Sequence, residues 1–216
     1  MKRSFIITFL CIEAALYAAF LALDLTGGAG PDTALKYGGI LLCLAFSVYA
    51  AAKGGDRLVP VALVLTALAD SLLLVLDAYY ALGVLIFLGA QSVYLIRLRL
   101  TTGRAWLLLR ALVPLAAGVL LYALGQASPL NLLAGLYFSQ LLVNAAIAWT
   151  VPGRRGKLFA IGLTLFIGCD VCVGAFNAAP GLLPDGLCRF AAVGMWLFYL
   201  PSQVLISLSA LPEKEL

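Results

Sequence analysis

Hydrophobic residues fill the chain in runs of about 20, the length that a helix needs to cross a bilayer. Short segments rich in charged residues, Gly and Pro separate these runs. The pattern predicts eight spans, at 4–23, 35–52, 58–76, 79–97, 105–124, 129–150, 157–177 and 188–210. We therefore expect an all-α fold, a polytopic membrane helical bundle with about eight transmembrane helices.

The composition excludes a soluble globular domain. Hydrophobic residues make up 64% of the chain and charged residues 11%, whereas soluble domains are nearer half apolar and a quarter charged. Every position lies in or beside an apolar run, so we expect residues 1–216 to form a single integral membrane domain. The run after Lys2 and Arg3 is longer than the core of a secretory signal peptide, which favours a retained first span.

The basic residues indicate the orientation. If the N-terminus is cytoplasmic, eleven of the 14 Lys and Arg residues lie inside, and only Lys36 and Arg189 lie outside. Arg110, in the fifth span, is near enough to the cytoplasm to extend towards it. Both termini are then cytoplasmic, and the net charge of +4 reflects topology rather than nucleic acid binding. The eleven are Lys2, Arg3, Lys53, Arg57, Arg97, Arg99, Arg104, Arg154, Arg155, Lys157 and Lys214.

The absence of histidine limits the possible chemistry. It excludes Ser-His-Asp triads and every metal site that contains histidine. Cys169 and Cys172 have a C-x-x-C spacing, but they lie inside a hydrophobic run without a second pair, so metal binding has weak support. Five cysteines cannot all pair, and we expect free thiols, with no metal and no cofactor.

Three carboxylates stand inside apolar runs, where each costs about 2.5 kcal/mol or more. Asp70 lies 13 residues beyond Arg57, and Asp170 lies 13 beyond Lys157, both in outward-running spans. Each is thus roughly 20 Å from the cytoplasmic charges, which predicts a shared site. Glu13 joins them if the first, third and seventh spans pack together; alternatively, it hydrogen-bonds to a neighbouring helix as a packing residue.

Other polar side chains also lie at membrane depth. Gln140 and Asn144 share a helix face, and a structural role in interhelical hydrogen bonds is favoured for them. Tyr199 and Gln203 share another face and suit a structural or a functional role equally.

Four short segments carry many of these residues. They are Ala69-Asp70-Ser71-Leu72-Leu73, Ala90-Gln91-Ser92-Val93-Tyr94, Phe166-Ile167-Gly168-Cys169-Asp170 and Tyr199-Leu200-Pro201-Ser202-Gln203-Val204-Leu205-Ile206. In this order they resemble the motifs of the YhhN family of eight-span membrane proteins, which includes the lysoplasmalogenases. The family pattern is Gly-Asp followed by leucines, then Ala-His-x-x-Tyr, Phe-x-x-Ser-Asp and Tyr-Tyr-x-Ala-Gln-x-Leu-Ile.

The resemblance implies roles for individual residues. Asp70 and Asp170 match the two family aspartates regarded as catalytic, and Tyr94, Tyr199 and Gln203 match supporting positions. The sequence departs from the pattern at several positions. If the family histidine shuttles protons, its replacement here implies slower turnover, a changed substrate or no activity. The departures are Gln91 for the histidine, Ala69 for Gly, Cys169 for Ser and Leu200 for the second tyrosine.

The function that the resemblance implies is hydrolysis of the vinyl ether bond of a lysoplasmalogen, which gives a fatty aldehyde and a glycerophospho-head group. Asp70 and Asp170 are then an acid/base pair. Tyr94, Tyr199 and Gln203 are expected to orient water or the head group, with Glu13 as a possible third carboxyl. The expected partner is a lysophospholipid within a bacterial cell membrane.

Two other functions remain open. Intramembrane carboxylates also mark proton-coupled transport of small molecules or lipids. However, the sequence lacks a pair of corresponding broken helices, which usually indicates a transport site. A catalytically inactive lipid-binding relative is the third possibility, because Gln91 replaces the histidine.

Overall fold

The chain folds as a bundle of long helices. The structure, a computed structural model, describes residues 3–26, 32–98, 103–177 and 183–215. Within these ranges there are eight α-helices and no strands. Eight helical spans are long and apolar enough to cross a membrane, the third of them running from Leu58 to Val75. The eight predicted spans are therefore confirmed. The helices are α1 (Arg3–Thr26), α2 (Asp32–Ala52), α3 (Leu58–Asp70), α4 (Tyr80–Arg97), α5 (Arg104–Ala123), α6 (Pro129–Ala148), α7 (Gly153–Phe176) and α8 (Asp185–Leu208).

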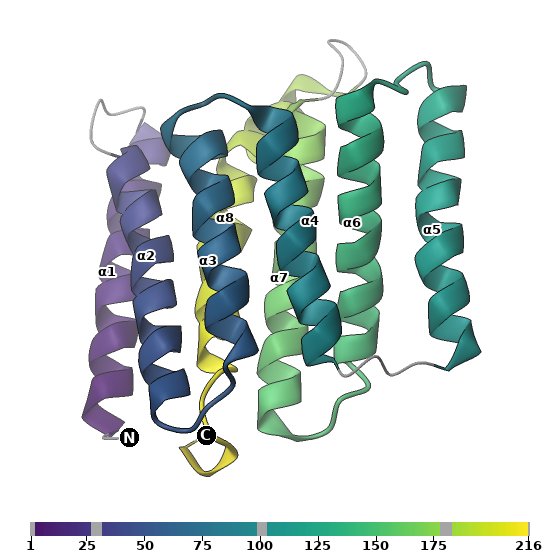
Figure 1. Cartoon of the computed structure of the whole chain (residues 1–216). Coiled ribbons are helices and arrows are strands. Elements are labelled where there is room, and N and C mark those ends of the chain that lie inside the picture. The colour runs from purple at the N-terminus through teal and green to yellow at the C-terminus, as the bar shows by residue number, and fades with distance from the viewer. Residues whose placement is uncertain (1–2, 27–31, 99–102, 178–182, 216) are drawn as a thin grey trace.

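Two short helical segments complete the described chain. A π-helical segment, η1 (Ser71–Val75), continues α3, and a 3₁₀ turn, η2 (Glu213–Glu215), follows α8. The helices lie side by side, and both ends of the chain lie at the same end of the bundle (Figure 1). The basic residues assign this end to the cytoplasm, and we call it the cytoplasmic end.

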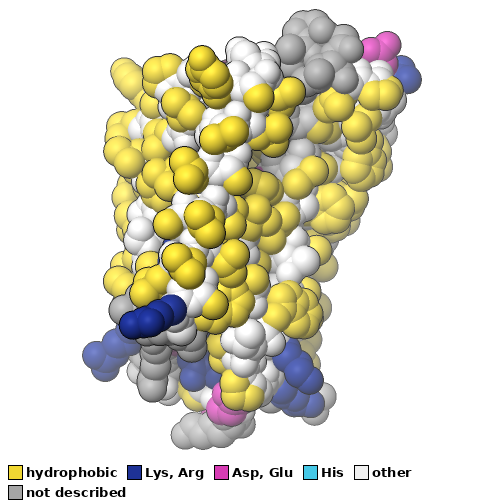
Figure 2. All heavy atoms as spheres, turned by 90° about the vertical axis from the view of Figure 1, so that its right-hand side faces the viewer, with side chains coloured by type: hydrophobic (Ala, Val, Ile, Leu, Met, Phe, Trp, Pro, Cys, Tyr) yellow, Lys and Arg dark blue, Asp and Glu magenta, His cyan; other side chains and the backbone are white. Residues whose placement is uncertain are grey.

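The outer surface is suited to lipid. Figure 2, which views the side formed by α5, shows hydrophobic side chains along the height of the bundle and most of the visible Lys and Arg near its lower end. Large apolar side chains such as Leu108, Leu115 and Val119 of α5 are exposed. An apolar belt between charged ends is what a bilayer requires, so the chain is a multi-pass membrane protein.

Helix α8 lies in the interior of the bundle. It packs against α7 and α2, and also against α1 and α3. Helix α5 is at the opposite extreme, because it lies at the edge beside α6 and has no buried residue among those described. The groups that face the interior are therefore presented mainly by α2, α3, α6, α7 and α8, with a smaller share from α4.

Two prolines inside helices create tertiary hydrogen bonds. Proline has no N–H, so the carbonyl four residues earlier loses its helical partner. Pro201 frees the carbonyl of Leu197, which accepts a hydrogen bond of 3.0 Å from Tyr17 Oη of α1. Pro114 frees the carbonyl of Arg110, to which Gln140 Nε2 of α6 donates at 3.4 Å. Donors from neighbouring helices thus satisfy backbone groups that lipid cannot.

Candidate functional site

Asp70 lies where α3 changes from α-helical to π-helical geometry. The π segment begins at Ser71, whose carbonyl accepts a hydrogen bond of 2.9 Å from the amide of Leu76. Ser71 Oγ also lies 2.8 Å from Tyr37 Oη of α2. Single π-helical turns occur frequently at functional sites, because they redirect the side chains beside them. The carboxyl of Asp70 thus lies at a local irregularity that neighbouring helices hold in place.

The Asp70 carboxyl is bound by Tyr199 of α8. Tyr199 Oη donates to Asp70 Oδ2 at 2.7 Å, and both residues are 5% exposed. The tyrosine ring packs between two aromatic rings, with centroid distances of 5.3 Å to Phe166 of α7 and 5.3 Å to Trp196 of α8. A short hydrogen bond to a carboxylate is among the stronger kinds. One oxygen of Asp70 is therefore held in a fixed direction.

Asp170 of α7 lies close enough to Asp70 for their charges to interact. The hydroxyl of Tyr137, on α6, lies beside the Asp170 carboxyl. Even so, Asp170 Oδ2 and Tyr137 Oη are both buried without a hydrogen-bond partner. The structure thus brings together the two aspartates whose matched depth predicted a shared site.

Tyr137 was not singled out from the sequence. It stands in the apolar segment Gly135-Leu136-Tyr137-Phe138, where an aromatic residue looks like ordinary core. Its ring packs against Phe87 of α4 at a centroid distance of 5.7 Å. Only the arrangement of α6 beside α7 places its hydroxyl at Asp170.

Glu13 does not join the aspartates. Helix α1 packs against α2 and α8, so the packing of the first, third and seventh spans that would bring the three carboxyls together does not form. Cys43 Sγ of α2 donates to Glu13 Oε1 at 3.3 Å, while Glu13 Oε2 is buried without a partner. The reason is that α2 lies between α1 and α3, while α8 lies between α1 and α7.

Gln91 belongs to a separate polar network. Asn144 Nδ2 of α6 donates to both the side-chain and the backbone oxygen of Gln91, at 2.9 Å each. Arg110 of α5 donates to Asn144 Oδ1 and to Gln140 Oε1, each at 2.8 Å. Arg110 therefore hydrogen-bonds to two side chains of α6 instead of extending to the cytoplasm, which corrects the expectation from the sequence. The structural role expected for Gln140 and Asn144 agrees with these bonds.

Tyr94 and Gln203 lie nearer the cytoplasmic end than Asp70 does. Tyr94 is three residues from the end of α4 and Asp70 twelve from the start of α3, which separates them by about 13 Å in depth. The hydroxyl of Tyr94 is buried without a hydrogen-bond partner. Gln203 Nε2 donates to Ser202 Oγ at 3.1 Å, while Gln203 Oε1 has no partner. These two residues are therefore not in hydrogen-bonding contact with the aspartates.

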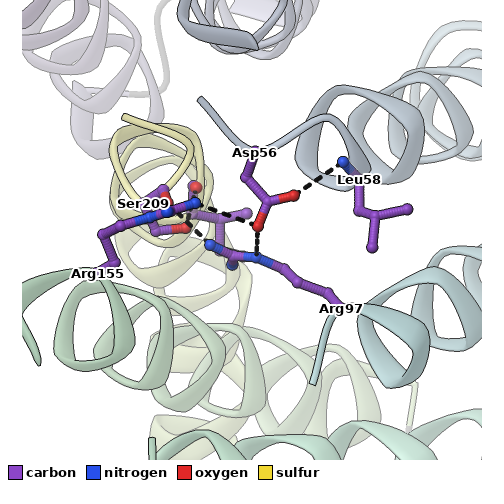
Figure 3. Close-up of polar contacts among 6 residues, drawn as sticks. Asp56, Leu58, Arg97, Arg155 and Ser209 are labelled. Atoms are coloured by element: carbon purple, nitrogen blue, oxygen red, sulfur yellow. Dashed lines mark hydrogen bonds and ion pairs between the residues drawn. The ribbon is translucent and has the colours of Figure 1, made fainter. Parts of the chain in front are cut away.

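A charged cluster lies at the cytoplasmic end (Figure 3). Asp56 Oδ2 accepts from Arg97 Nε at 2.8 Å and from Arg155 Nη2 at 3.3 Å. Both arginines also donate to the carbonyl of Ser209, at 2.8 and 3.3 Å. Burial acts to raise the pKa of Asp56, but Arg97, the backbone amide of Leu58 and Arg155 together outweigh it and hold the pKa below its ordinary value. The sequence identified the arginines only as topology signals.

A second ion cluster lies at the opposite end. Lys36 Nζ contacts Asp24 at 2.8 Å and Asp32 at 3.1 Å, and it lies 5.1 Å from the centre of the Trp196 ring. Both aspartates are thus in ion pairs with Lys36. Nowhere in the described chain are three His, Cys, Asp or Glu residues grouped so that they could hold a metal ion.

Comparison with known proteins places the chain in a family. A model described as the YhhN family matches residues 32–210, which include α2 to α8 and both aspartates. No curated protein matches the chain, and no solved structure matches it.

Proposed function

Because the chain belongs to the YhhN family, we propose that it is a membrane-embedded hydrolase that resembles the lysoplasmalogenases. Its substrate is a lysoplasmalogen in a bacterial cell membrane. Its products are a fatty aldehyde and a glycerophosphoethanolamine or glycerophosphocholine. The observation that carries the proposal is the Tyr199–Asp70 hydrogen bond beside Asp170, because it presents two carboxyls at one level inside the membrane.

The chemistry needs two carboxyls in different states. A vinyl ether is hydrolysed by protonation of a carbon atom, which leaves an oxocarbenium ion. Water then adds to the cationic carbon and loses a proton, and the hemiacetal collapses to an aldehyde and an alcohol. One carboxyl must donate the first proton, while a carboxylate stabilises the cation and accepts the proton of water. Glycosidases divide these roles between two carboxyls in the same way.

The contacts suggest which aspartate has which role. Asp70 is assigned the carboxylate role, because Tyr199 donates to one of its oxygens and fixes the direction of the other. Asp170 is assigned the role of proton donor, because its buried Oδ2 is not held by a hydrogen bond of the kind that Tyr199 donates to Asp70. Tyr137 lies beside Asp170 and orients it in this scheme.

A single-chain lipid suits this site. Asp170 is only partly buried, and its neighbours Val171 and Val173 on α7 are exposed on the apolar surface. A lysophospholipid already in the bilayer can therefore approach Asp170 laterally with its chain in hydrocarbon. Transport would move a substrate across the membrane without breaking a bond, so product analysis separates the two functions.

The test uses purified protein, a lysoplasmalogen and mass-spectrometric detection of free fatty aldehyde. The wild type should release aldehyde, and Asp70→Asn and Asp170→Asn should each abolish it while keeping thermal stability near wild type. Asp185→Asn, at the exposed start of α8, is the matched control and should retain activity. Absence of aldehyde from well-folded wild type, or activity that survives both substitutions, contradicts the proposal.

Lipid binding without turnover is a second candidate, and Gln91 favours it. An amide does not accept and return a proton as imidazole does. Asn144 also occupies the side-chain oxygen of Gln91. Under this alternative the wild type binds lysophospholipid, and the same binding is seen with Asp70→Asn, but neither protein releases aldehyde.

A further inference from the structure

Unpaired polar atoms are concentrated in the interior of the bundle. Among the described residues, nine buried side-chain nitrogen and oxygen atoms lack a hydrogen-bond partner. Two of them, on Glu13 and Asp24, belong to α1. The other seven belong to α3, α4, α6, α7 and α8, and we call their residues the polar column. The column consists of Thr66, Gln91, Tyr94, Arg97, Tyr137, Asp170 and Gln203.

The column runs along the axis of the bundle. On α4, Arg97, Tyr94 and Gln91 follow one another every third residue, so they lie on one side of the helix in steps of about 4.5 Å. The first of these three, Arg97, is at the cytoplasmic cluster around Asp56 (Figure 3). The α4 part of the column therefore begins at the cytoplasmic end and rises into the membrane.

Neighbouring helices continue the column towards the aspartates. Thr66 lies four residues before Asp70 on α3, and Gln203 four residues after Tyr199 on α8, each a step of about 6 Å on a shared face. The Tyr94 hydroxyl lies beside Thr66, which joins α4 to α3. Helix α3 packs against both α4 and α8. Polar atoms thus extend from Arg97 to the level of Asp70.

Tyr94 lies beside Thr66 and Tyr137 beside Asp170, so each pair can share one hydrogen bond. The remaining donors and acceptors of the column need partners that the described part of the protein does not supply. A buried polar group without a hydrogen bond costs about 1–3 kcal/mol. The column presents donors on Arg97 and Gln91, acceptors on Gln203 and Asp170, and hydroxyls that can be either. A cation would suit only the acceptors and an anion only the donors. Water both donates and accepts, and buried water commonly satisfies such groups.

We propose that the polar column is a water-filled route from the cytoplasmic end to Asp70 and Asp170. Vinyl ether hydrolysis consumes one water molecule per turnover, and the hydrocarbon around the site does not supply it. The lipid then approaches from the side, whereas water and protons come along the bundle axis. The catalytic consequence rests on the proposed function, but the presence of water in the column does not.

Hydroxyl-radical footprinting tests the column independently of activity. Protein in lipid nanodiscs is exposed to X-ray pulses, which generate radicals from water beside a side chain, and oxidation is located by mass spectrometry. The comparison is between Tyr94 and Phe46, which are 0% and 1% exposed. Phe46 stacks on Phe9 at 4.1 Å in an apolar setting. Each rate is divided by that of the same residue in unfolded protein, to remove intrinsic reactivity.

The expected result is oxidation of Tyr94 several-fold faster than that of Phe46, despite equal burial. Equal protection of Tyr94 and Phe46 overturns the proposal, because burial alone then accounts for both. Thr66→Val supplies a second variant, since valine keeps the shape of threonine and removes the hydroxyl. It should reduce the oxidation of Tyr94, and unchanged oxidation contradicts a role for Thr66 in the column.

Turnover rates of two variants test whether the column serves the proposed reaction. Thr66→Val should lower kcat for aldehyde release about threefold to tenfold, the equivalent of a weakened hydrogen bond, and leave KM unchanged. Thr164→Val is the matched control: Thr164 is exposed on α7, donates within its own helix, and its substitution should leave kcat unchanged. Unfolding temperatures establish that both variants fold. If the wild type releases no aldehyde, the proposed function is wrong, and footprinting still tests whether the column holds water. If aldehyde forms but Tyr94 is protected from oxidation, only the proposal of a water-filled column is wrong.

Discussion

Tyr199 and Asp70 are 129 residues apart in the sequence and are joined by a hydrogen bond of 2.7 Å. The bond connects the interior helix α8 to the last residue of α3, just before the π-helical segment. The direction of the Asp70 carboxyl therefore depends on the packing of α8 as well as on the course of α3.

Removal of the Tyr199 hydroxyl should reduce catalysis. A hydrogen bond to a charged group contributes about 1.5–3 kcal/mol, so Tyr199→Phe is expected to lower aldehyde release about tenfold or more. The measurement is the initial rate of aldehyde formation by mass spectrometry. Tyr122→Phe is the matched control, because Tyr122 is 79% exposed at the end of α5. Equal rates for Tyr199→Phe and wild type would contradict the role assigned to this bond.

Arg110 should hold α5 on the bundle. Helix α5 lies at the edge and packs mainly against α6, and Arg110 donates to Gln140 and Asn144 of α6. Arg110→Leu leaves two amide oxygens without these donors, and we expect a loss of about 1–3 kcal/mol for each that remains buried. The unfolding temperature in detergent should fall clearly. Arg104→Leu, at the exposed start of α5, should have little effect, and equal behaviour of the two variants would refute the role of Arg110.

The cytoplasmic cluster should make stability depend on acid pH. Arg97, the backbone amide of Leu58 and Arg155 together hold the pKa of Asp56 below its ordinary value of 3.8, against the effect of burial. A carboxyl whose pKa is lowered by folding contributes stability above the unfolded pKa, and this is lost as pH falls through the folded pKa. Asp56→Asn should therefore destabilise the protein at pH 7, and its difference from wild type should shrink below about pH 4. Unfolding temperatures between pH 3 and 7 measure this, and a constant difference would contradict it.

The hydrogen bond from Tyr17 should matter only because of Pro201. Tyr17→Phe leaves the carbonyl of Leu197 without a partner, and we expect it to cost about 1 kcal/mol or more. Pro201→Ala restores an N–H that can bond to this carbonyl, so Tyr17→Phe should cost much less in that background. A double-mutant cycle of unfolding free energies measures the coupling. Strictly additive effects would show that the proline does not create the bond.

Several features of the site could be predicted from the sequence because they depend on distances along a helix. The rise per residue is constant, so equal spacing from Arg57 and Lys157 placed Asp70 and Asp170 at one depth. The positions of Tyr137 and Glu13 depend instead on which helices are neighbours. Apolar residues surround both, and in lipid a packed face and an exposed face can be equally apolar, so no amphipathic stripe identifies the contacts.

The sequence by itself determined the eight spans, the placement of both termini on one side and the depth of the two aspartates, because bilayer thickness, loop charge and helix rise act locally along the chain. Only the tertiary structure decided that α8 occupies the interior. That arrangement joins Tyr199 to Asp70, separates Glu13 from the aspartates and aligns the polar column. The physical reason is that lateral packing in a membrane follows close fit and interhelical hydrogen bonds, which depend on all helices together.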